Sequence, residues 1–514
     1  MARSSRNVLI GLDAGGSYVK ATAFDLANGH SATFKRSVGT SHPRPGHNER
    51  DAELLWMRAA EVIRSAVEAV PHGRDRVAAV GVTAHGNGLY LVDEYGVPTR
   101  ASIQASDTRA ADLVHRWAVN GVPEQLREQV WNDLWPGQPG PLLAWLARHE
   151  PDTLRRSSTA LMCGDYLRAR LTGTLQGELT TWSCNGLLDS SNLSISDAAL
   201  CSYEIEDLKR LLPPLVTHDM LVGPITCEAA KLTGLPEGTP VSAGVVDNVA
   251  LQLGAGVTDG THILVGAGTW SINQLLVPQD QMTISGALGA VSPYAACLAV
   301  PTGMALLIEA SATSASTLTW ALDHVQRGPS IEADRLGINV YDHVLEAVRD
   351  LTPDPNGPMF IPYLDGSRQS AGARGAWLGL SSSDTDYTML KAVVEGICLE
   401  HRRHVGALAA ASSPTTPLRL AGGAARSRIW SQLFADVSGR VVEVSPVEEI
   451  GAVGAAIIAG VATDEFASLD AGIEHLNPHH ETFAPDPERA AFYSKRFARY
   501  SRWVNRIEED PWAG

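Results

Sequence analysis

Residues 7–30 read NVLIGLDAGGSYVKATAFDLANGH, two apolar runs joined by a glycine-rich turn. Beyond the glycines, Val19, Ala21 and Ala23 alternate with polar residues, which is the period of a β-strand and not of a helix. The segment therefore predicts a β-hairpin closed by the glycines. A dinucleotide-binding fold would continue from a GxGxxG turn into a helix, and this segment has neither feature.

The same layout returns about 250 residues later. The segment THILVGAGTWSINQLLV, residues 261–277, again reads as a strand, a glycine turn and a strand, and LRLAGGAARSRIWSQLFADVSGRVVEV, residues 418–444, reads as a strand, a glycine turn, a helix and a strand. A pattern that recurs over this distance indicates two related α/β halves. We expect a first domain over residues 1–253 and a second over residues 254–514.

Composition excludes several classes of protein. With 44% hydrophobic and 19% charged residues, the chain of 514 residues is typical of ordered proteins with a large core. A net charge of −16 argues against nucleic acid and anionic membranes as partners. The longest run without polar side chains, GAVGAAIIAGVA at residues 451–462, is shorter than the roughly 20 residues that span a membrane, and predicts a tightly packed core helix.

Six scattered cysteines form no CxxC pair. In a chain of this length they predict reduced core thiols in a cytoplasmic protein, and not a disulfide framework.

The first glycine turn has the chemistry of a phosphate site. The glycines Gly15 and Gly16 let backbone N–H groups approach a ligand, and Ser17 adds a hydroxyl. Asp13 suits Mg²⁺ held through water, and Lys20 would offset phosphate charge. The alternative is an ordinary β-hairpin without a ligand.

Two later turns extend this interpretation. In GAGTW, Gly268 and Thr269 repeat the glycine and hydroxyl of the first turn, so a matched pair of turns favours phosphate binding in two halves. In AGGAARSRIW, Gly422 and Gly423 precede a helix that begins near Ser427, and a base or ribose could lie on such a glycine pair. A tight turn between strand and helix is the alternative for the third segment.

The segment PVSAGVVDNVALQLGAG, residues 240–256, places Asp247 and Asn248 within an otherwise small and apolar run. Burying a carboxylate without partners costs several kcal/mol, so Asp247 must be paired, exposed in a cleft or functional. A helix is expected to begin just beyond it, and helix capping is the structural alternative. The functional interpretation is a general base that accepts a hydroxyl proton, the task that an aspartate performs in protein kinases.

Two further polar residues fit a ligand rich in hydroxyl groups. His85 lies in the glycine-rich turn of TAHGNGLYLVD, and Asp107 in QASDTRA stands at the expected start of a helix. Histidine and aspartate are natural partners of sugar hydroxyls. The alternatives are a structural histidine and a helix N-cap.

Together these stretches resemble the FGGY family of carbohydrate kinases over nearly the whole chain. The family's first signature is similar to GQPGPLLAWLARH, residues 137–149, although Leu142 stands where the family usually has lysine. The second is similar to GAWLGLSSSDTDYTMLKAVVE, residues 375–395, with Thr388 where a more polar residue is usual. The resemblance implies a two-domain actin-like ATPase fold, ribonuclease H-like, with an interdomain cleft.

The family's functional positions carry over onto residues of this chain. The resemblance implies a sugar-binding domain over residues 1–253, an ATP-binding domain over residues 254–514, and both ATP and Mg²⁺, the latter at Asp13. It makes Asp247 the catalytic base. The implied sugar-binding residues are His85, Asp107, Asp247 and Asn248. The implied ATP-binding residues are Asp13, Gly15, Gly16, Ser17, Gly268, Thr269, Gly422, Gly423 and Ser427. We add Lys20 to this set because of its charge in the first glycine turn.

The segments GLDAGGSYVKA, AHGNGLYLVD, ASDTRA and DYLRARLTG look most like L-xylulose kinases. This implies phosphorylation of a terminal hydroxyl of a small linear ketose such as L-xylulose or a related pentulose. Erythritol kinases share much of the pattern, so a polyol is an alternative substrate. D-xylulokinases usually carry a bulkier turn around Ser106 and Glu-Arg at the place of Ser367 and Arg368, yet stay an alternative.

Two other classes of protein stay open, an actin-like ATPase without a sugar substrate and a catalytically inactive sensor. The expected partner is a small sugar or polyol, with a homodimer as one of the open oligomeric states.

Overall fold

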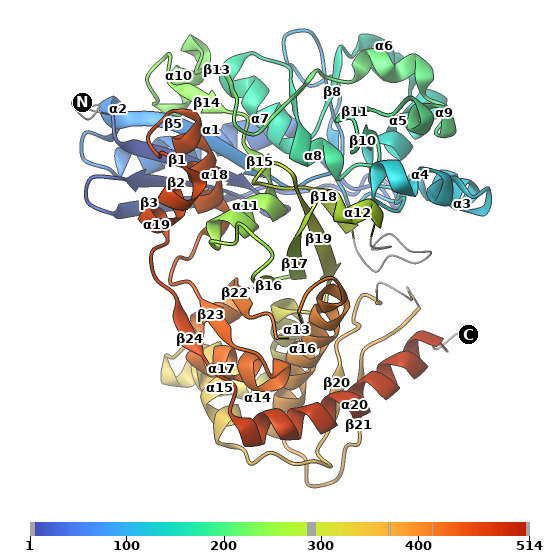
Figure 1. Cartoon of the computed structure of the whole chain (residues 1–514), viewed down its shortest axis with the longest axis vertical. Coiled ribbons are helices and arrows are strands. Elements are labelled where there is room, and N and C mark those ends of the chain that lie inside the picture. The colour runs from blue at the N-terminus through green and yellow to red at the C-terminus, as the bar shows by residue number, and fades with distance from the viewer. Residues whose placement is uncertain (1–5, 285–294, 368–369, 371, 414, 510–514) are drawn as a thin grey trace. The chain divides into compact units, whose positions relative to one another are not determined.

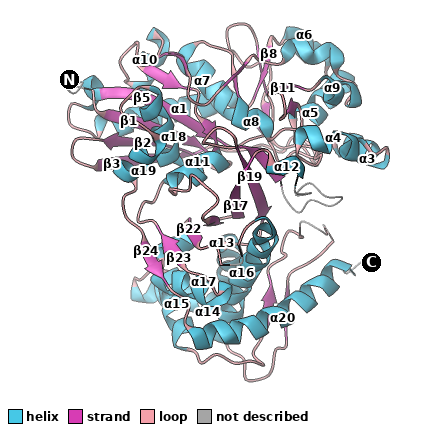
Figure 2. Cartoon of the chain, in the orientation of Figure 1, coloured by secondary structure: helices cyan, strands magenta, loops and turns pink. Residues whose placement is uncertain are grey.

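The computed structural model describes residues 6–284, 295–367, 370, 372–413 and 415–509 (Figure 1). The chain divides into two compact units. Unit 1 comprises Met1–Thr258, Val277–Leu306 and Glu449–Pro478. Unit 2 comprises Asp259–Leu276, Leu307–Glu448 and His479–Gly514. Figure 2 shows strands and helices in both units, which confirms the predicted α/β class.

Unit 1 is built on a sheet of order β13-β14-β5-β1-β2-β3, with β15 also paired to β5. The strands are β1 (Val8–Ala14), β2 (Tyr18–Asp25), β3 (His30–Ser37), β5 (Val77–Ala84), β13 (Leu221–Pro224), β14 (Pro240–Ser242) and β15 (Val245–Val246). The first two form the predicted antiparallel hairpin, in which Ala14 lies opposite Val19. Strands β1, β14 and β15 all run parallel to β5, so their carboxyl ends point the same way.

The helices and short strands of unit 1 complete its core. Helix α1 packs on β2 and β3, and its N-cap is Asp51, whose carboxylate accepts from the N–H of Leu54 at 3.1 Å. The helices are α1 (Ala52–Glu68), α2 (Gly73–Arg76), α3 (Ala111–Val119), α4 (Val122–Val130), α5 (Pro139–His149), α6 (Pro151–Arg156), α7 (Cys163–Thr172), α8 (Leu179–Ser183), α9 (Asp197–Ser202), α10 (Cys227–Thr233), α11 (Asp247–Gly254), α12 (Gln281–Ile284), α18 (Ile450–Ala462) and α19 (Leu469–Leu476). The short strand pairs are β4 (Glu49–Arg50) with β7 (Ser102–Ile103), β6 (Tyr90–Val92) with β8 (Thr159–Leu161), β9 (Gly177–Glu178) with β12 (Leu215–Val216), and β10 (Leu188–Asp189) with β11 (Ser194–Ile195).

The second sheet has the order β18-β19-β17-β16-β22-β23-β24, and β16, β22, β23 and β24 lie in unit 2, whereas β18 belongs to unit 1. The strands are β16 (Ile263–Ala267), β17 (Ser271–Pro278), β18 (Ala295–Leu298), β19 (Met304–Ser311), β22 (Leu418–Ala421), β23 (Val442–Val444) and β24 (Glu481–Phe483). The predicted second hairpin is confirmed, since β16 and β17 are antiparallel with Ala267 opposite Ser271. The predicted strand, turn, helix and strand of the third segment are also confirmed, and β22 runs parallel to β16.

The helices of unit 2 include α16, which packs on β16, and α17, which packs on β23 and β24 (Figure 1). They are α13 (Ala315–Trp320), α14 (Arg327–Leu336), α15 (Val340–Asp350), α16 (Asp386–Leu408), α17 (Arg428–Ser438) and α20 (Pro487–Glu509), with β20 (Met359–Ile361) and β21 (Ala376–Leu378) forming a separate antiparallel pair.

Each compact unit is made of segments that are not contiguous in the chain. The sequence predicts that everything after residue 253 belongs to the second domain, whereas Val277–Leu306 and Glu449–Pro478 pack within unit 1. The second of these segments carries α18, the predicted core helix, which packs on β1, β5 and α11. A helix that consists of small and aliphatic residues all round has no polar face for solvent, so burial against the first sheet decides its place.

Helix α18 approaches its neighbours at backbone distance, and glycines make this contact possible. A Cβ atom added to Gly81 of β5 would lie 1.9 Å from the carbonyl oxygen of Ala455, and one added to Gly454 would lie 2.0 Å from that of Ala250 in α11. No side chain larger than hydrogen fits at either contact. The sheet, α18 and α11 therefore form one closely packed block.

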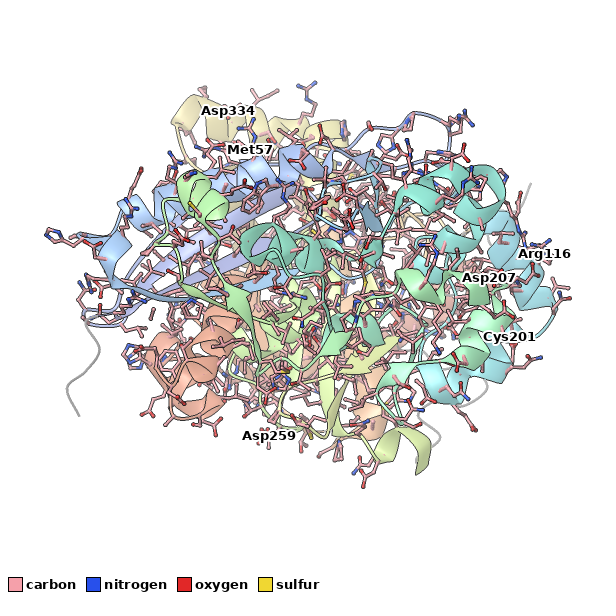
Figure 3. All side chains as sticks on the ribbon, turned by 90° about the horizontal axis from the view of Figure 1, so that it is seen from above. Met57, Arg116, Cys201, Asp207, Asp259 and Asp334 are labelled. Atoms are coloured by element: carbon pink, nitrogen blue, oxygen red, sulfur yellow. The ribbon has the colours of Figure 1, made fainter. Side chains whose placement is uncertain are left out.

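The cysteines depart in part from the predicted core thiols. Cys163, Cys297 and Cys398 are buried and Cys184 is half-buried, but Cys201, labelled in Figure 3, and Cys227 are exposed. All six are free thiols, as predicted.

Within the described part of the chain, no helix has the length and apolar character needed to cross a membrane.

We expect Gly81→Ala to lower the free energy of unfolding by about 1–3 kcal/mol, because the added methyl group collides with the backbone of α18. The matched control is Gly406→Ala in α16, at an exposed position where an added Cβ meets nothing within 4 Å. The control should be neutral or stabilising by up to about 1 kcal/mol, since alanine favours helix. Thermal unfolding of the two variants beside the wild type checks this, and equal melting temperatures would contradict the close packing.

Candidate active site

Three predicted residues meet at one edge of the first sheet. The register places Asp13 of β1 and Val246 of β15 beside the last two residues of β5. His85 follows β5 directly, and Asp247 follows β15 directly. Ligands in open α/β sheets bind at the carboxyl ends of parallel strands, and this edge is such a place.

Asp247 is the first residue of α11, and the N-cap position is taken by Val246. Helix capping, the structural alternative for Asp247, is therefore wrong in its strict form, although the carboxylate still lies in the favourable field of the helix N-terminus. One of its oxygens accepts from the backbone N–H of Asn248 at 2.8 Å. Both side chains are half-buried. Among the residues that the structure describes, this carboxylate accepts no second hydrogen bond.

Both carboxylates at this edge have a raised pKa. Burial raises the pKa of Asp247 to about 6, the charge of Asp13 adds to the rise, and His85 opposes it. Burial likewise raises the pKa of Asp13 to about 6, with Lys20 acting in the opposite direction and Glu449 adding to the rise. Neighbouring like charges in a poorly hydrated place favour the protonated form, which is the cause of both shifts.

The charges of both acids affect the pKa of His85. Burial lowers the pKa of the imidazole, as does the positive charge of Arg50, while Asp247 and Asp13 oppose the shift. Its Nδ1 lies 3.3 Å from the carbonyl oxygen of Gly86. Its Nε2 is buried and has no hydrogen-bond partner in the described structure. A neutral ring with an unsatisfied nitrogen fits the predicted role as a hydroxyl partner better than a purely structural role.

Asp107 is in a different situation. It lies in the loop between β7 and α3, whose N-cap is Ala110, so the N-cap alternative is wrong for Asp107. The carboxylate is buried and accepts from the backbone N–H of Asn48 at 2.6 Å and from the guanidinium of Arg109 at 2.9 Å. Both of its oxygens are thus occupied within the protein, and direct contact with a sugar would require these bonds to break.

The first glycine turn matches its prediction in part. The N–H of Gly15 donates to the carbonyl of Tyr18 at 2.9 Å and so closes the hairpin, and Gly16 and Ser17 between them are exposed. Lys20 forms an ion pair with Glu449 at 2.8 Å. Within unit 1 the charge of Lys20 is therefore offset by that of Glu449.

The second and third glycine turns adjoin one another in unit 2. Gly266 is the register partner of Ala421, so the turns that follow β16 and β22 leave the same edge of the second sheet. Gly422 has φ of 89°, and a Cβ there would lie 2.8 Å from the carbonyl oxygen of Ala267. Both the conformation and the close approach require glycine. The sequence repeat thus brings two predicted ligand turns together.

The remaining predicted residues of unit 2 surround these turns. Gly268 accepts from the N–H of Ala315 at 2.9 Å, which fixes its turn, and Thr269 beside it is exposed. Gly423 is also exposed. Ser427 is the N-cap of α17, so the predicted helix start is confirmed.

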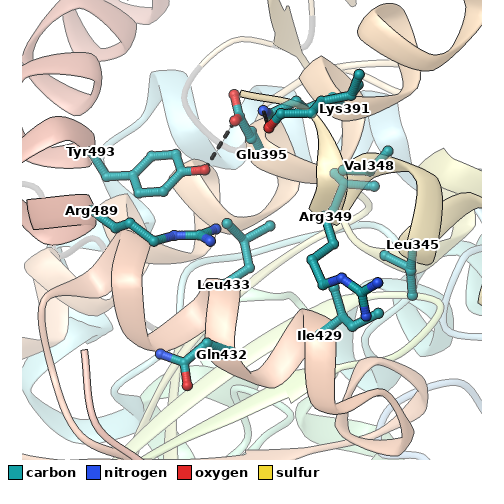
Figure 4. Close-up of a pocket in the computed structure, with 12 residues that line it drawn as sticks. Leu345, Val348, Arg349, Lys391, Glu395, Ile429, Gln432, Leu433, Arg489 and Tyr493 are labelled. Carbon is teal, nitrogen blue, oxygen red and sulfur yellow. Dashed lines mark hydrogen bonds between the residues drawn. The ribbon is translucent and has the colours of Figure 1, made fainter. Parts of the chain in front are cut away.

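A pocket in unit 2 lies apart from every predicted site residue (Figure 4). It is lined by α15, α16, α17 and α20, and Tyr493 donates to Glu395 at 3.0 Å across it. Lys391 donates to the carbonyl of Leu351 at 2.7 Å, and Arg489 pairs with Asp436 at 2.7 Å. Its polar groups are engaged with the protein itself, so we assign no ligand to it.

Sequence patterns do not identify two of the residues that lie at this edge of the first sheet. Glu449 comes from the start of α18, some 430 residues from Lys20, and only tertiary packing places it there. Arg50 stands before the helix cap Asp51 in the segment HNERDAE, where the sequence suggests an ordinary surface arginine, yet it is 2% exposed. No local signal distinguishes a buried arginine from an exposed one.

Known proteins match the chain over its whole length. The model of the FGGY family of carbohydrate kinases, N-terminal domain, matches residues 8–254, and that of the C-terminal domain matches residues 264–463. An L-xylulose/3-keto-L-gulonate kinase of Escherichia coli is 31% identical over 97% of each chain, and a probable L-xylulose kinase of Pasteurella multocida is 31% identical over 98% of this chain and 99% of that one. The solved xylulose kinase of Rhodospirillum rubrum superimposes with a TM-score of 0.84 at 25% identity, covering 98% of this chain and 99% of that one.

The raised pKa of Asp247 has a consequence for stability. In the folded state its pKa is about 6, above the ordinary value of 3.8, so folding is favoured when the group is protonated and this contribution is lost as the pH rises through about 6. We expect Asp247→Asn to raise the melting temperature at pH 8 by roughly 1–3 °C, because it removes a charge that the fold disfavours. The gain should shrink at pH 4.5. A loss of stability at pH 8, or the same gain at both pH values, would contradict the assigned shift.

Proposed function

The chain belongs to the FGGY family of carbohydrate kinases, and from this premise we propose that it transfers the γ-phosphate of ATP to a terminal hydroxyl of a small linear ketose. The observation that carries the proposal is the carboxylate of Asp247, which is half-buried at the start of α11 beside Asp13 and His85. Such a group can accept a proton from an alcohol.

Asp247 acts as the general base. It accepts the proton of the terminal hydroxyl while that oxygen forms a bond to the γ-phosphorus of ATP. The bond between this phosphorus and the bridging oxygen breaks, and ADP leaves with the electron pair. A pKa of about 6 leaves Asp247 mostly ionised at neutral pH, yet makes it a stronger base than an ordinary aspartate.

His85 and Asn248 bind and orient the sugar. The buried Nε2 of His85 lacks a partner in the described structure, so a sugar hydroxyl would satisfy it. For Asp107 we propose a positioning role, since its carboxylate holds the backbone of Asn48 at the entry to β4. This assignment keeps Asp107 in the sugar-binding part of the protein without requiring its existing hydrogen bonds to break.

The glycine turns bind ATP. In unit 2, Gly268 and Thr269 would contact the phosphates, and the glycine pair Gly422 and Gly423, followed by the cap of α17 at Ser427, would hold the adenosine. In unit 1, Gly16 and Ser17 would add phosphate contacts while Gly15 shapes the turn. Lys20 keeps Glu449 neutralised at the edge of this turn.

Mg²⁺ fits the chemistry of Asp13. The side chain is a half-buried carboxylate with no hydrogen bond among the residues described, and hard cations such as Mg²⁺ prefer carboxylate and water oxygens. Asp13 would hold the ion, most simply through water. When bound, Mg²⁺ would supply positive charge to the phosphates of ATP.

The names of the relatives guide the choice of substrate. Two relatives that match nearly the whole chain are named for L-xylulose, and one of them also for 3-keto-L-gulonate. We propose the same class for this enzyme, a linear ketose with a free terminal hydroxyl, phosphorylated in the cytosol where ATP is available.

We expect Asp247→Asn to lower kcat by about 10²–10⁴-fold, the usual contribution of a positioned general base, with little change in the affinity for ATP or sugar. The matched control is Asp197→Asn, which alters another aspartate at the first position of a helix, on the exposed surface of α9. The control should stay within about twofold of the wild type. Near-wild-type turnover by Asp247→Asn in a coupled ADP assay would refute the role of the base.

The substrate is tested by ADP release over a panel of pentuloses, hexuloses and four- and five-carbon polyols. We expect kcat/KM for one linear ketose, L-xylulose or a close relative, to exceed that of the polyols by at least tenfold. ADP release that needs no added sugar would instead favour a plain ATPase, and a preference for erythritol would place the enzyme with the polyol kinases.

A further inference from the structure

Arg50 is a buried cation for which the described residues provide no ion pair. It is the second residue of β4, is 2% exposed, and its Nη2 donates to the carbonyl oxygen of Gly16 in the first glycine turn. Its Nε and Nη1 are buried and make no hydrogen bond within the described ranges. In those ranges it also forms no ion pair within 4 Å. Burying an unpaired guanidinium costs several kcal/mol, so a fold retains one only for a reason.

The neighbouring arginines show how the fold treats a cation that has only a structural role. Arg109 pairs with Glu49 at 2.7 Å and with Asp107 at 2.9 Å, and Arg100 pairs with Glu49 and with Glu150. Both lie around the same short strand as Arg50. Glu49, adjacent in sequence to Arg50, is therefore already shared by two other arginines.

Arg50 and His85 both contact the first glycine turn. The Arg50 guanidinium donates to the carbonyl oxygen of Gly16, and the backbone N–H of His85 donates to the carbonyl oxygen of Ala14 at 3.1 Å. The charge of Arg50 is accordingly one of the causes that lower the pKa of the His85 imidazole, after burial. The unpartnered Nε2 of His85 and the unpartnered nitrogens of Arg50 thus belong to one cluster of unsatisfied polar groups.

Resting on the proposed function, we propose that Arg50 contacts the sugar and selects a ketose that carries a carboxylate, a keto sugar acid, over the neutral ketose. A carboxylate matches the planar guanidinium through two parallel hydrogen bonds and supplies the missing negative charge. The hydroxyl groups of a neutral ketose would satisfy the nitrogens but leave the buried charge uncompensated. Arg50 is in this view a specificity-determining residue, separate from the base Asp247.

An oxyanion near Arg50 can come from two sources, the sugar carboxylate and the phosphate that is being transferred. The probes that separate them are L-xylulose and 3-keto-L-gulonate, because the second is formally the first with a carboxylate on its terminal carbon next to the ketone. A contact with the sugar carboxylate affects only the acid. A contact with the phosphate affects both substrates equally and alters the KM for ATP.

The experiment measures kcat/KM for both probes with the full-length wild type and with Arg50→Gln and Arg50→Lys. We expect the wild type to prefer the acid by at least about tenfold, and Arg50→Gln to lower kcat/KM for the acid by about 10- to 100-fold, mainly through KM, with a change of less than about threefold for L-xylulose. Arg50→Lys should recover part of the loss, since lysine keeps the charge but not the paired geometry.

Arg100→Gln is the matched control, because it removes a neighbouring arginine that is already paired within the protein. Its ratio of acid to neutral substrate should equal that of the wild type, even if its stability falls. An equal loss for both probes in Arg50→Gln would assign the contact to phosphate and overturn the selection of sugar acids. A wild type that prefers L-xylulose would overturn it as well.

A binding measurement separates failure of this inference from failure of the proposed function. In thermal unfolding without ATP, 3-keto-L-gulonate should stabilise the wild type more than Arg50→Gln, whereas L-xylulose should stabilise both alike. If neither probe released ADP but this difference appeared, the kinase activity on these ketoses would be refuted and the Arg50 contact retained. Absence of the difference would refute the contact whatever the turnover.

Discussion

The backbone contact between α18 and the first sheet fixes the positions of the proposed catalytic groups. The Cβ of a residue at Gly11 would lie 2.1 Å from the carbonyl oxygen of Ala452, and the glycines of β5 and α11 meet α18 just as closely. Asp13 ends the strand that contains Gly11, and Asp247 begins the helix on the other side of α18. Because hydrogen is the only side chain that fits these contacts, neither acid can shift without moving the whole block.

This rigidity lets the fold hold two carboxylates in an environment that each of them disfavours. Asp13 and Asp247 both have raised pKa values, chiefly because of burial, and a neighbouring negative charge adds to each rise: Glu449 for Asp13, and Asp13 for Asp247. If the edge were loosely packed, the backbone would move and water would hydrate both carboxylates. Holding two carboxylates in this environment lowers the stability of the fold. Active sites commonly carry such a cost, because catalysis requires pKa values that differ from those that would favour stability.

The charged residues near β4 and the first glycine turn differ in whether they form ion pairs within the chain. Lys20, Arg100 and Arg109 are each neutralised by a nearby carboxylate, whereas Arg50 and the imidazole of His85 keep unsatisfied nitrogens in the described structure. Arg109 also keeps one nitrogen without a hydrogen bond in the described structure, but its charge is paired with carboxylates, whereas Arg50 forms no ion pair there. The absence of an ion pair therefore distinguishes Arg50 from the arginines beside it.

The sequence by itself determined the local elements and the repeated pattern. The alternation after Gly16 predicted the first hairpin, its recurrence at Gly268 predicted the second, and Asp247 stood out as an acid in an apolar segment, because all of these depend on neighbours in the chain. Tertiary structure alone decided that α18 packs in unit 1, that Lys20 is paired with Glu449, and that Arg50 is buried. Those facts depend on contacts between residues far apart in the chain, which no local periodicity records.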